Sequence, residues 1–172
     1  MRQFLRSSRQ AQNQVLALLQ SVFAAELIAP NKQIWLVSPW LSDIAILDNR
    51  SGGFRACKPS WENRMIHLSE LLTESVRRGT RVVIVTRPNQ TQVIETIRSK
   101  LTDDQAQQRF EWRYSNTLHA KGLLTDDCCL TGSMNFTHNG LLRLEEMLTY
   151  HTEKPKIAET RLEFGKEYQV NS

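Results

Sequence analysis

Two stretches decide the fold of this sequence: residues 117–126, Thr-Leu-His-Ala-Lys-Gly-Leu-Leu-Thr-Asp, and residues 131–137, Thr-Gly-Ser-Met-Asn-Phe-Thr. Polar and apolar residues alternate in the first stretch, which predicts a β-strand whose period of two places His119 and Lys121 on one face. The turn that follows predicts a second strand over 128–131, whose end delivers Ser133 and Asn135. An imidazole, an ammonium, a hydroxyl and an amide are therefore expected in one place, and together they suit a phosphate group.

These residue types fit the transfer of a phosphodiester without a metal. Such a reaction needs a nucleophile, positive charge for the non-bridging oxygens and an acid for the leaving oxygen. An imidazole titrates near neutral pH, so His119 can serve as nucleophile or as acid. Lys121 brings a compact positive charge, while Ser133 and Asn135 bring neutral donors. A carboxylate such as Glu146 can orient the imidazole and stabilise its protonated form.

Each of these residues also has an ordinary structural explanation. A lone histidine on a strand is usually structural, a lone lysine is a surface charge, and Asn135 can cap the element that follows it. The pair Asp126 and Asp127 alone is an ordinary turn. The joint occurrence of these residues at set spacings favours a functional site. Asp126 has the least defined role, because it lies beyond the turn and can brace the loop instead of contacting a substrate.

The pattern His-x-Lys-x4-Asp, followed by Gly-Ser-x-Asn, resembles the signature of the phospholipase D superfamily. Its residues in this sequence are His119, Lys121, Asp126, Gly132, Ser133 and Asn135. The family also places a glutamate downstream, which corresponds to Glu146 or to the adjacent Glu145. The resemblance implies that the catalytic residues are His119, Lys121, Asp126, Ser133, Asn135 and Glu146. It further implies a phosphohistidine intermediate on His119 that water hydrolyses.

Two other segments are candidates for contact with a substrate. The apolar run before Ser38-Pro39-Trp40 is similar to an early strand of this family, and α/β sheets present their ligands at strand ends. Ser38 and Trp40 are therefore candidate substrate-binding residues, although Trp40 suits a core or rim position equally well. The long loop over 48–62 mixes aromatic with basic residues, which suits stacking and phosphate contact. Arg55 is the candidate there, and a surface loop without a ligand role is equally consistent.

The order of predicted elements indicates an α/β fold, a mixed central β-sheet with helices on both faces. The further strands are expected over 33–37, 81–86, 110–114 and 146–151, and the helices over 10–29, 66–78, 91–101 and 155–168. With 172 residues, of which 40% are hydrophobic, the chain is expected to form a single domain over 1–172. Residues 1–10 carry arginines without acidic residues and are expected to form a basic arm, which either contacts nucleic acid or is simply solvated.

The charge and the composition of the sequence limit the kinds of partner that we expect. The net charge is +4, which favours a polyanion such as DNA. No apolar run reaches the roughly 20 residues that a membrane span needs, and the polar start does not resemble a signal peptide. The three cysteines form no Cys-x-x-Cys pair, and no histidine stands at a metal-ligand spacing. We expect a reduced, cytoplasmic protein without membrane contact, cofactor or metal.

The predicted function is that of a metal-independent phosphodiesterase, most simply a DNA endonuclease. The small size and basic charge are similar to the compact bacterial nucleases of the family, and the overall sequence resembles the phospholipase D-like proteins of systems that place 7-deazaguanine bases in DNA. The family's reaction uses two copies of the motif, and this chain carries one, which implies a homodimer with a shared active site. The alternatives are a lipid phosphodiesterase or phosphatidyltransferase, and a non-catalytic DNA-binding subunit of a restriction or modification system.

Overall fold

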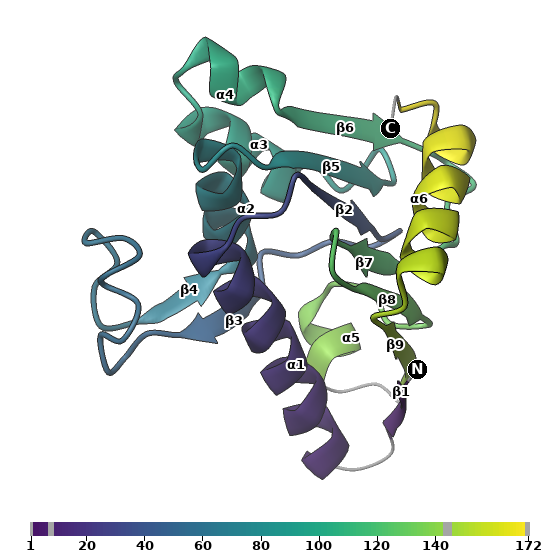
Figure 1. Cartoon of the computed structure of the whole chain (residues 1–172), viewed down its shortest axis with the longest axis horizontal. Helices are drawn as coiled ribbons and strands as arrows, with labels where there is room; N and C mark the ends of the chain where they lie inside the picture. Colours follow the sequence, from purple (N-terminus) through teal and green to yellow (C-terminus); the bar gives the residue numbers. More distant parts are fainter. Residues whose placement is uncertain (1, 7–8, 143–145, 171–172) are drawn as a thin grey trace.

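The computed structural model describes residues 2–6, 9–142 and 146–170. Seven strands of these residues form one sheet, in the order β1-β9-β8-β7-β2-β5-β6 (Figure 1). The strands are β1 (Arg2–Arg6), β2 (Gln33–Val37), β5 (Arg81–Thr86), β6 (Phe110–Tyr114), β7 (Gly122–Leu124), β8 (Cys129–Gly132) and β9 (Glu146–His151). Strands β2, β5 and β6 are parallel, and β2, β7, β8, β9 and β1 pair antiparallel. The predicted mixed sheet is confirmed.

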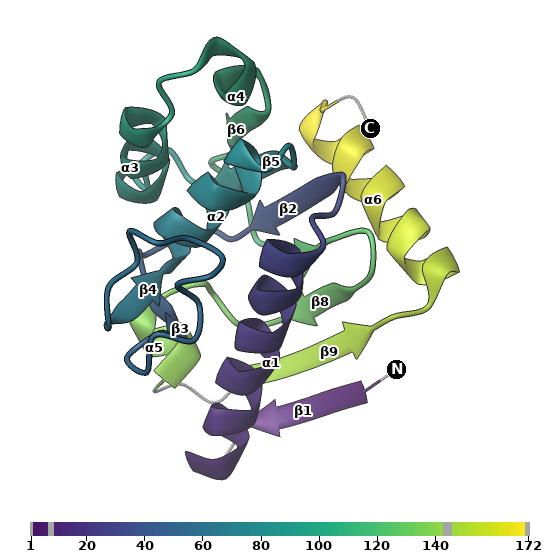
Figure 2. The same cartoon turned by 60° about the vertical axis from the view of Figure 1, so that its left-hand side comes forward.

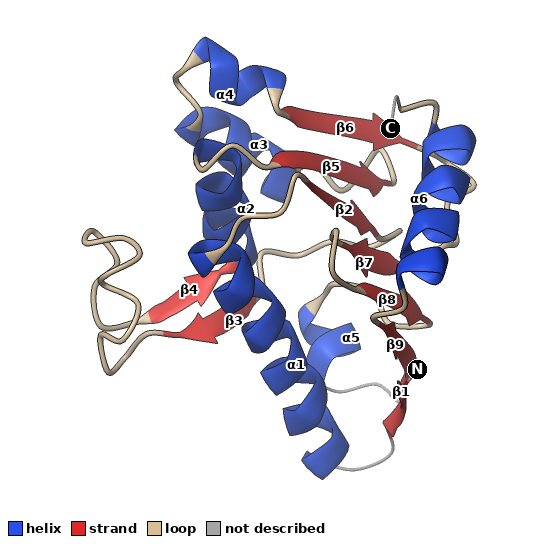
Figure 3. Ribbon diagram, in the orientation of Figure 1, coloured by secondary structure: helices blue, strands red, loops and turns tan. Residues whose placement is uncertain are grey.

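Helices cover both faces of this sheet, as the sequence predicts (Figures 1 and 3). They are α1 (Arg9–Ile28), α2 (Leu68–Arg77), α3 (Gln92–Lys100), α4 (Asp104–Gln108), α5 (His138–Leu142) and α6 (Lys154–Tyr168). Helices α1, α2, α3 and α5 lie on one face, and α6 is the helix of the described residues that covers the other, which Figure 2 shows from a second direction. The sheet is thus the middle layer of three.

Strand β2 shows why the core has two halves. All five of its residues are buried, and successive side chains of a strand point to opposite faces. Ile34 and Leu36 join the larger apolar cluster under α1 and α2. Trp35 and Val37 join the smaller cluster, where Phe164 of α6 packs with its ring centroid 5.9 Å from that of Trp35. An apolar run of this kind is typical of a strand that is covered on both sides.

The N-terminal segment differs from its prediction as a basic arm. Residues 2–6 form β1, which pairs antiparallel with β9 from Arg2 opposite Tyr150 to Arg6 opposite Glu146. Without this strand, β9 would present an open edge of unpaired backbone groups. The prediction rested on the charge of the arginines and overlooked Phe4 and Leu5 between them, which give the segment strand character. The sequence analysis also lacks α4, a short helix that Asp103 caps by accepting a hydrogen bond from the Ala106 amide at 2.8 Å.

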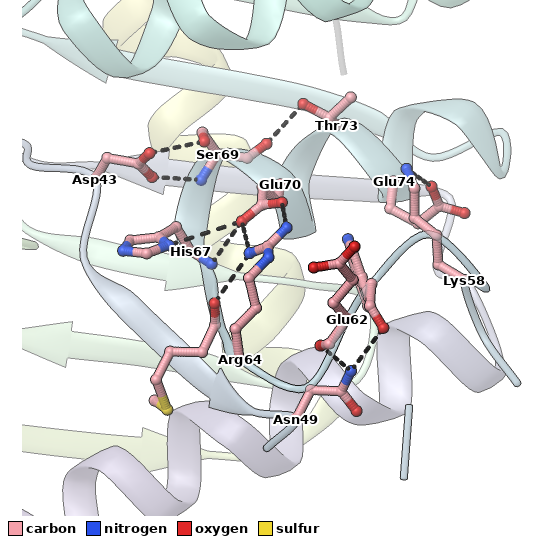
Figure 4. Close-up of polar contacts among 12 residues, drawn as sticks. Asp43, Asn49, Lys58, Glu62, Arg64, His67, Ser69, Glu70, Thr73 and Glu74 are labelled. Carbon is pink, nitrogen blue, oxygen red and sulfur yellow. Dashed lines mark hydrogen bonds and ion pairs between the residues drawn. The ribbon is translucent and has the colours of Figure 1, made fainter. Parts of the chain in front are cut away.

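The segment predicted as a long loop over 48–62 belongs to a hairpin. Strands β3 (Ala45–Asp48) and β4 (Met65–His67) pair antiparallel, and the loop between them spans residues 49–64. Polar contacts hold this loop together and fasten it to α2 (Figure 4). The side-chain amide of Asn49 donates to the carbonyl groups of Trp61 and Glu62 at 3.1 and 3.0 Å. The ammonium group of Lys58 lies 2.8 Å from Glu74.

An ion pair between Arg64 and Glu70 also links the hairpin to α2. Two guanidinium nitrogens donate to the two carboxylate oxygens at 2.9 and 2.7 Å. Burial raises the pKa of Glu70, but the hydrogen bonds from Arg64 and from the His67 amide outweigh it and bring the pKa to about 2. A carboxylate with a lowered pKa in the folded state stabilises the fold above its ordinary pKa near 4.5. That contribution is lost as the pH falls from about 4.5 to about 2.

We predict that Arg64→Met lowers the free energy of unfolding by about 1 kcal/mol at pH 7, because the pair is half-exposed. At pH 2.5 the difference from wild type should be small, since most of the stability linked to Glu70 has then been lost in both proteins. Urea unfolding at the two pH values measures both differences. Arg50→Met is the control, because it removes a pair of the same type with the more exposed Asp48. It should lower the free energy of unfolding by less than Arg64→Met does. An equal loss for Arg64→Met at both pH values would contradict this account.

Candidate active site

The His-x-Lys segment lies at the edge of the sheet where the parallel strands end. The predicted strand begins three residues later than His119, at Gly122, which pairs with Val37 at the end of β2. His119 is exposed, and the ammonium group of Lys121 donates to the His119 carbonyl oxygen at 2.5 Å. The preceding residue, Leu118, is buried and anchors the segment in the smaller core cluster. His119 and Lys121 are therefore held at this edge without being part of the sheet ladder.

The turn after β8 brings Ser133 to Glu146 at the same edge. Gly132 permits the turn, because a Cβ at this position would lie 2.0 Å from the Met147 carbonyl oxygen. The Ser133 hydroxyl donates to the carboxylate of Glu146 and accepts from the Met147 amide at 3.0 Å. Glu146 is only 8% exposed, so the hydroxyl supplies a partner that a buried carboxylate needs. Of the two candidate glutamates, Glu146 is placed here, and Glu145 lies outside the described residues.

Burial and nearby charges shift the pKa of Lys121. Partial burial lowers its pKa, the negative charge of Glu146 opposes that shift, and the positive charge of Arg87 adds to it. The net effect is a lowered pKa. Lys121, Glu146 and Arg87 therefore lie close enough to share one electrostatic environment. The orientation of His119 by Glu146 remains a prediction.

Ser38 has a different role from the one predicted. Its side chain is buried, and the hydroxyl donates to the Trp40 carbonyl oxygen at 2.6 Å and accepts from the Phe136 amide at 3.1 Å. It thus joins the segment after β2 to the turn that carries Asn135. A hydroxyl with both partners inside the protein is not available for a substrate. The side-chain oxygen of Asn135 is buried without a hydrogen-bond partner in the protein.

Trp40 lies at the site edge, and Arg87 is a residue that the sequence analysis missed. Trp40 is 43% exposed, and the guanidinium carbon of Arg87 lies 5.3 Å from the centroid of its ring. Arg87 directly follows β5 and donates to the Leu118 carbonyl oxygen at 3.2 Å. The signal that could have identified it is a cation immediately after the apolar run Val82 to Val85 of a parallel strand, since such strands end at the ligand-binding edge.

Two predicted site residues lie elsewhere. Asp126 is at the far end of β7, where one carboxylate oxygen accepts from the Lys32 amide at 2.6 Å and the other lies 2.7 Å from Arg161. Asp126 lies five positions after Lys121 along extended chain, about 15 Å away, so it braces a loop at the opposite edge of the sheet. Arg55 belongs to the loop over 49–64, which is fastened to the last turns of α2 through Glu74 and not to the site.

A cleft of about 640 Å³ opens beside the site, between residues 115–120 and the last turns of α6. Its walls include His119, Glu163, Lys166 and Tyr168.

Within the described ranges, no three histidine, cysteine or acidic side chains are grouped so that they could hold a metal ion. No helix in the described part of the chain combines the length and the apolar character that a membrane crossing requires.

Comparison with known proteins identifies the family. The family model described as "Cardiolipin synthase, PLD-like domain" matches residues 26–168. The chain belongs to this phospholipase D-like family. Family membership supports phosphodiesterase activity and agrees with the resemblance of the His-x-Lys motif. No curated protein matches the chain.

Solved structures of this fold agree with that membership. NucT from Helicobacter pylori has a TM-score of 0.61 at 13% identity, with 98% of this chain and 95% of NucT covered. Nuc from Salmonella typhimurium, a phospholipase D family member, has a TM-score of 0.55 at 16% identity, with 98% and 92% covered. The archaeal chromatin protein TrmBL2, which binds DNA, has a TM-score of 0.52 at 13% identity, with 93% and 60% covered. At such identities the likeness concerns the fold.

Proposed function

We propose that this protein is a metal-independent phosphodiesterase that cleaves DNA. The observation that carries the proposal is the meeting of His119 and Lys121 with the Ser133–Glu146 pair at one edge of the sheet. A substrate phosphate at this edge finds a nucleophile, a cation and the Asn135 amide, while the Ser133 hydroxyl donates to Glu146 and holds that carboxylate in place. The nuclease-like folds of NucT and Nuc and the DNA-binding relative TrmBL2 favour DNA. Free, largely buried cysteines suit a cytoplasmic protein.

In the proposed reaction, a ring nitrogen of His119 attacks the phosphorus atom and forms a P–N bond while the bond to the leaving oxygen breaks. An acid protonates that oxygen. Water then attacks the phosphorus, the P–N bond breaks, and the imidazole is restored. Lys121 stabilises the charge on the non-bridging oxygens in both steps, and the amide of Asn135 donates to them. Glu146, held by Ser133, favours the positively charged imidazole.

The proposal includes a homodimer with one shared site. A protomer offers one His-x-Lys motif, and no second copy occurs in the sequence. A lone protomer would therefore have a nucleophile without the histidine acid that protonates the leaving oxygen. An isologous pairing of the edges that carry His119 supplies a second imidazole and a second lysine, and two-fold dimers are the commonest closed assemblies.

A lipid phosphodiester is the second candidate substrate, because the matching family model takes its description from cardiolipin synthase. The site chemistry is the same for both substrates. Exposed apolar side chains near the site are Trp40 and Met147. Phosphatidylglycerol vesicles therefore belong in the activity assay beside DNA.

We predict that DNA hydrolysis persists in excess EDTA, because Lys121 supplies the positive charge that a metal supplies in other nucleases. Labelled single- and double-stranded DNA, with and without 7-deazaguanine bases, measures cleavage and tests the resemblance to DNA-modification systems. His119→Ala should abolish cleavage. His138→Ala, which changes a nearby exposed histidine outside the motif, is the matched control and should remain active. Loss of activity in EDTA with recovery in a divalent ion would refute the mechanism.

We predict that the active site is shared between protomers. When wild-type protein exchanges subunits with an excess of His119→Ala, hybrids lack one imidazole, so activity per wild-type chain should fall steeply. Sedimentation measures the assembly, and initial rates measure activity. An excess of His138→Ala is the control and should keep the rate per total chain near the wild-type value, because this variant is itself expected to be active. A monomer that turns over, or activity proportional to wild-type protein alone, would show that each protomer carries a complete site.

A further inference from the structure

A cation and an aromatic ring stand side by side next to the His-x-Lys segment. Trp40 follows β2 and Arg87 follows β5, and both lie at the edge of the sheet that carries His119. In sheet order, β7, β2 and β5 are neighbours. Adjacent strands are about 4.8 Å apart, so the ends of β7 and β5 are separated by about 10 Å. The two residues are therefore displaced to one side of Lys121.

Arg87 lacks the carboxylate partner that several arginines of this fold have, among them Arg64, Arg78, Arg81 and Arg161. Among the described residues, no carboxylate forms an ion pair with Arg87. Its guanidinium group donates to the Leu118 carbonyl oxygen and lies over the Trp40 ring, and its buried Nε has no hydrogen-bond partner. A half-buried cation without a counter-charge is suited to an anion that arrives with a ligand.

The ring beside Arg87 is held firmly. The Trp40 carbonyl oxygen accepts from the Ser38 hydroxyl at 2.6 Å, and the next amide, that of Leu41, donates to the Gln90 side chain at 3.1 Å. Both hydrogen bonds fix the peptide group that follows Trp40, while 43% of the residue stays exposed. An aromatic ring held in this way is a platform on which a base can stack at little cost in conformational entropy.

We propose that Arg87 and Trp40 form a subsite for a single nucleic-acid strand, in which Arg87 binds the phosphate that flanks the scissile one and Trp40 stacks on the intervening base. This inference rests on the proposed nuclease function. The guanidinium fork matches the geometry of two phosphate oxygens. The lateral displacement from Lys121 suits a neighbouring phosphate of a polymer, which a small phosphodiester lacks.

Binding is measured in the His119→Ala background, so that cleavage plays no part. Fluorescence anisotropy with a labelled single-stranded DNA oligonucleotide at several salt concentrations gives the affinity and its salt dependence. Arg87→Ala should weaken binding about tenfold and reduce the slope of log K against log salt by about 0.7, the value for one phosphate contact on a single strand. Trp40→Ala should weaken binding by about tenfold and leave the slope unchanged.

The matched control is Arg98→Ala. The guanidinium carbon of Arg98 lies 4.8 Å from the centroid of the Trp112 ring, so the substitution removes the same kind of contact away from the site. It should change neither affinity nor slope. Arg87→Lys keeps the charge and loses the fork, so it should keep the slope and lose affinity. If urea titrations show that Arg87→Ala is not folded, Arg87→Lys provides the test of the subsite.

Cleavage rates on two substrates distinguish a contact with the flanking phosphate from a contact with the scissile phosphate. With His119 intact, Arg87→Ala should lose about ten times more activity on DNA than on bis(4-nitrophenyl) phosphate, which has no flanking phosphate. Equal losses on both substrates would overturn the proposal, as would an unchanged salt slope. If no phosphodiester is cleaved by the wild-type protein, the nuclease function fails, while the binding measurements still decide whether the subsite exists.

Discussion

The pairing of β2 with a parallel neighbour on one side and an antiparallel neighbour on the other determines where the candidate site lies. Val37 at the end of β2 stands opposite Val85 of β5 and opposite Gly122 of β7. The parallel strand therefore ends where the antiparallel strand begins. Residues that follow β2 and β5 meet residues that precede β7, and the apolar side chains on both faces of β2 leave the sheet edge as the place for polar chemistry.

Polar contacts then connect the segments that gather at this edge. The Ser38 hydroxyl joins the Trp40 segment to the turn after β8, and the Ser133 hydroxyl joins that turn to Glu146 on β9. Both hydroxyl groups form their hydrogen bonds within the protein, so they hold neighbouring segments in position. Gly132 belongs to the same arrangement, because any larger residue would collide with the backbone of β9. The His-x-Lys segment is thus supported by backbone and hydroxyl groups that a motif pattern does not display.

The sequence allowed the central strands and the motif to be predicted because their signals are local. The run over 82–86 is β-branched throughout, and the bounds of the strand over 81–86 were predicted correctly. Of the predicted site residues, Ser133 and Glu146 share a hydrogen bond, and His119 and Lys121 lie at the same edge of the sheet, while their catalytic roles stay predictions. Other features depend on contacts between distant segments. The strand over residues 2–6 depends on its pairing with β9, and the hairpin around 49–64 depends on contacts with α2. The distance of Asp126 from the site follows from the length of β7, and the position of Arg87 follows from the parallel pairing of β5.

The central claim is that His119 forms a covalent bond to phosphorus. The most direct test is an acid-free rapid quench, in alkaline denaturant, of the wild-type protein after brief mixing with an end-labelled DNA substrate, followed by mass spectrometry of its peptides. The account predicts a phosphohistidine that still carries the labelled DNA fragment, on the peptide that contains His119, stable to alkali and lost in acid, with no adduct in His119→Asn. Label on another residue, or label retained by His119→Asn, would contradict the assignment of His119 as the nucleophile.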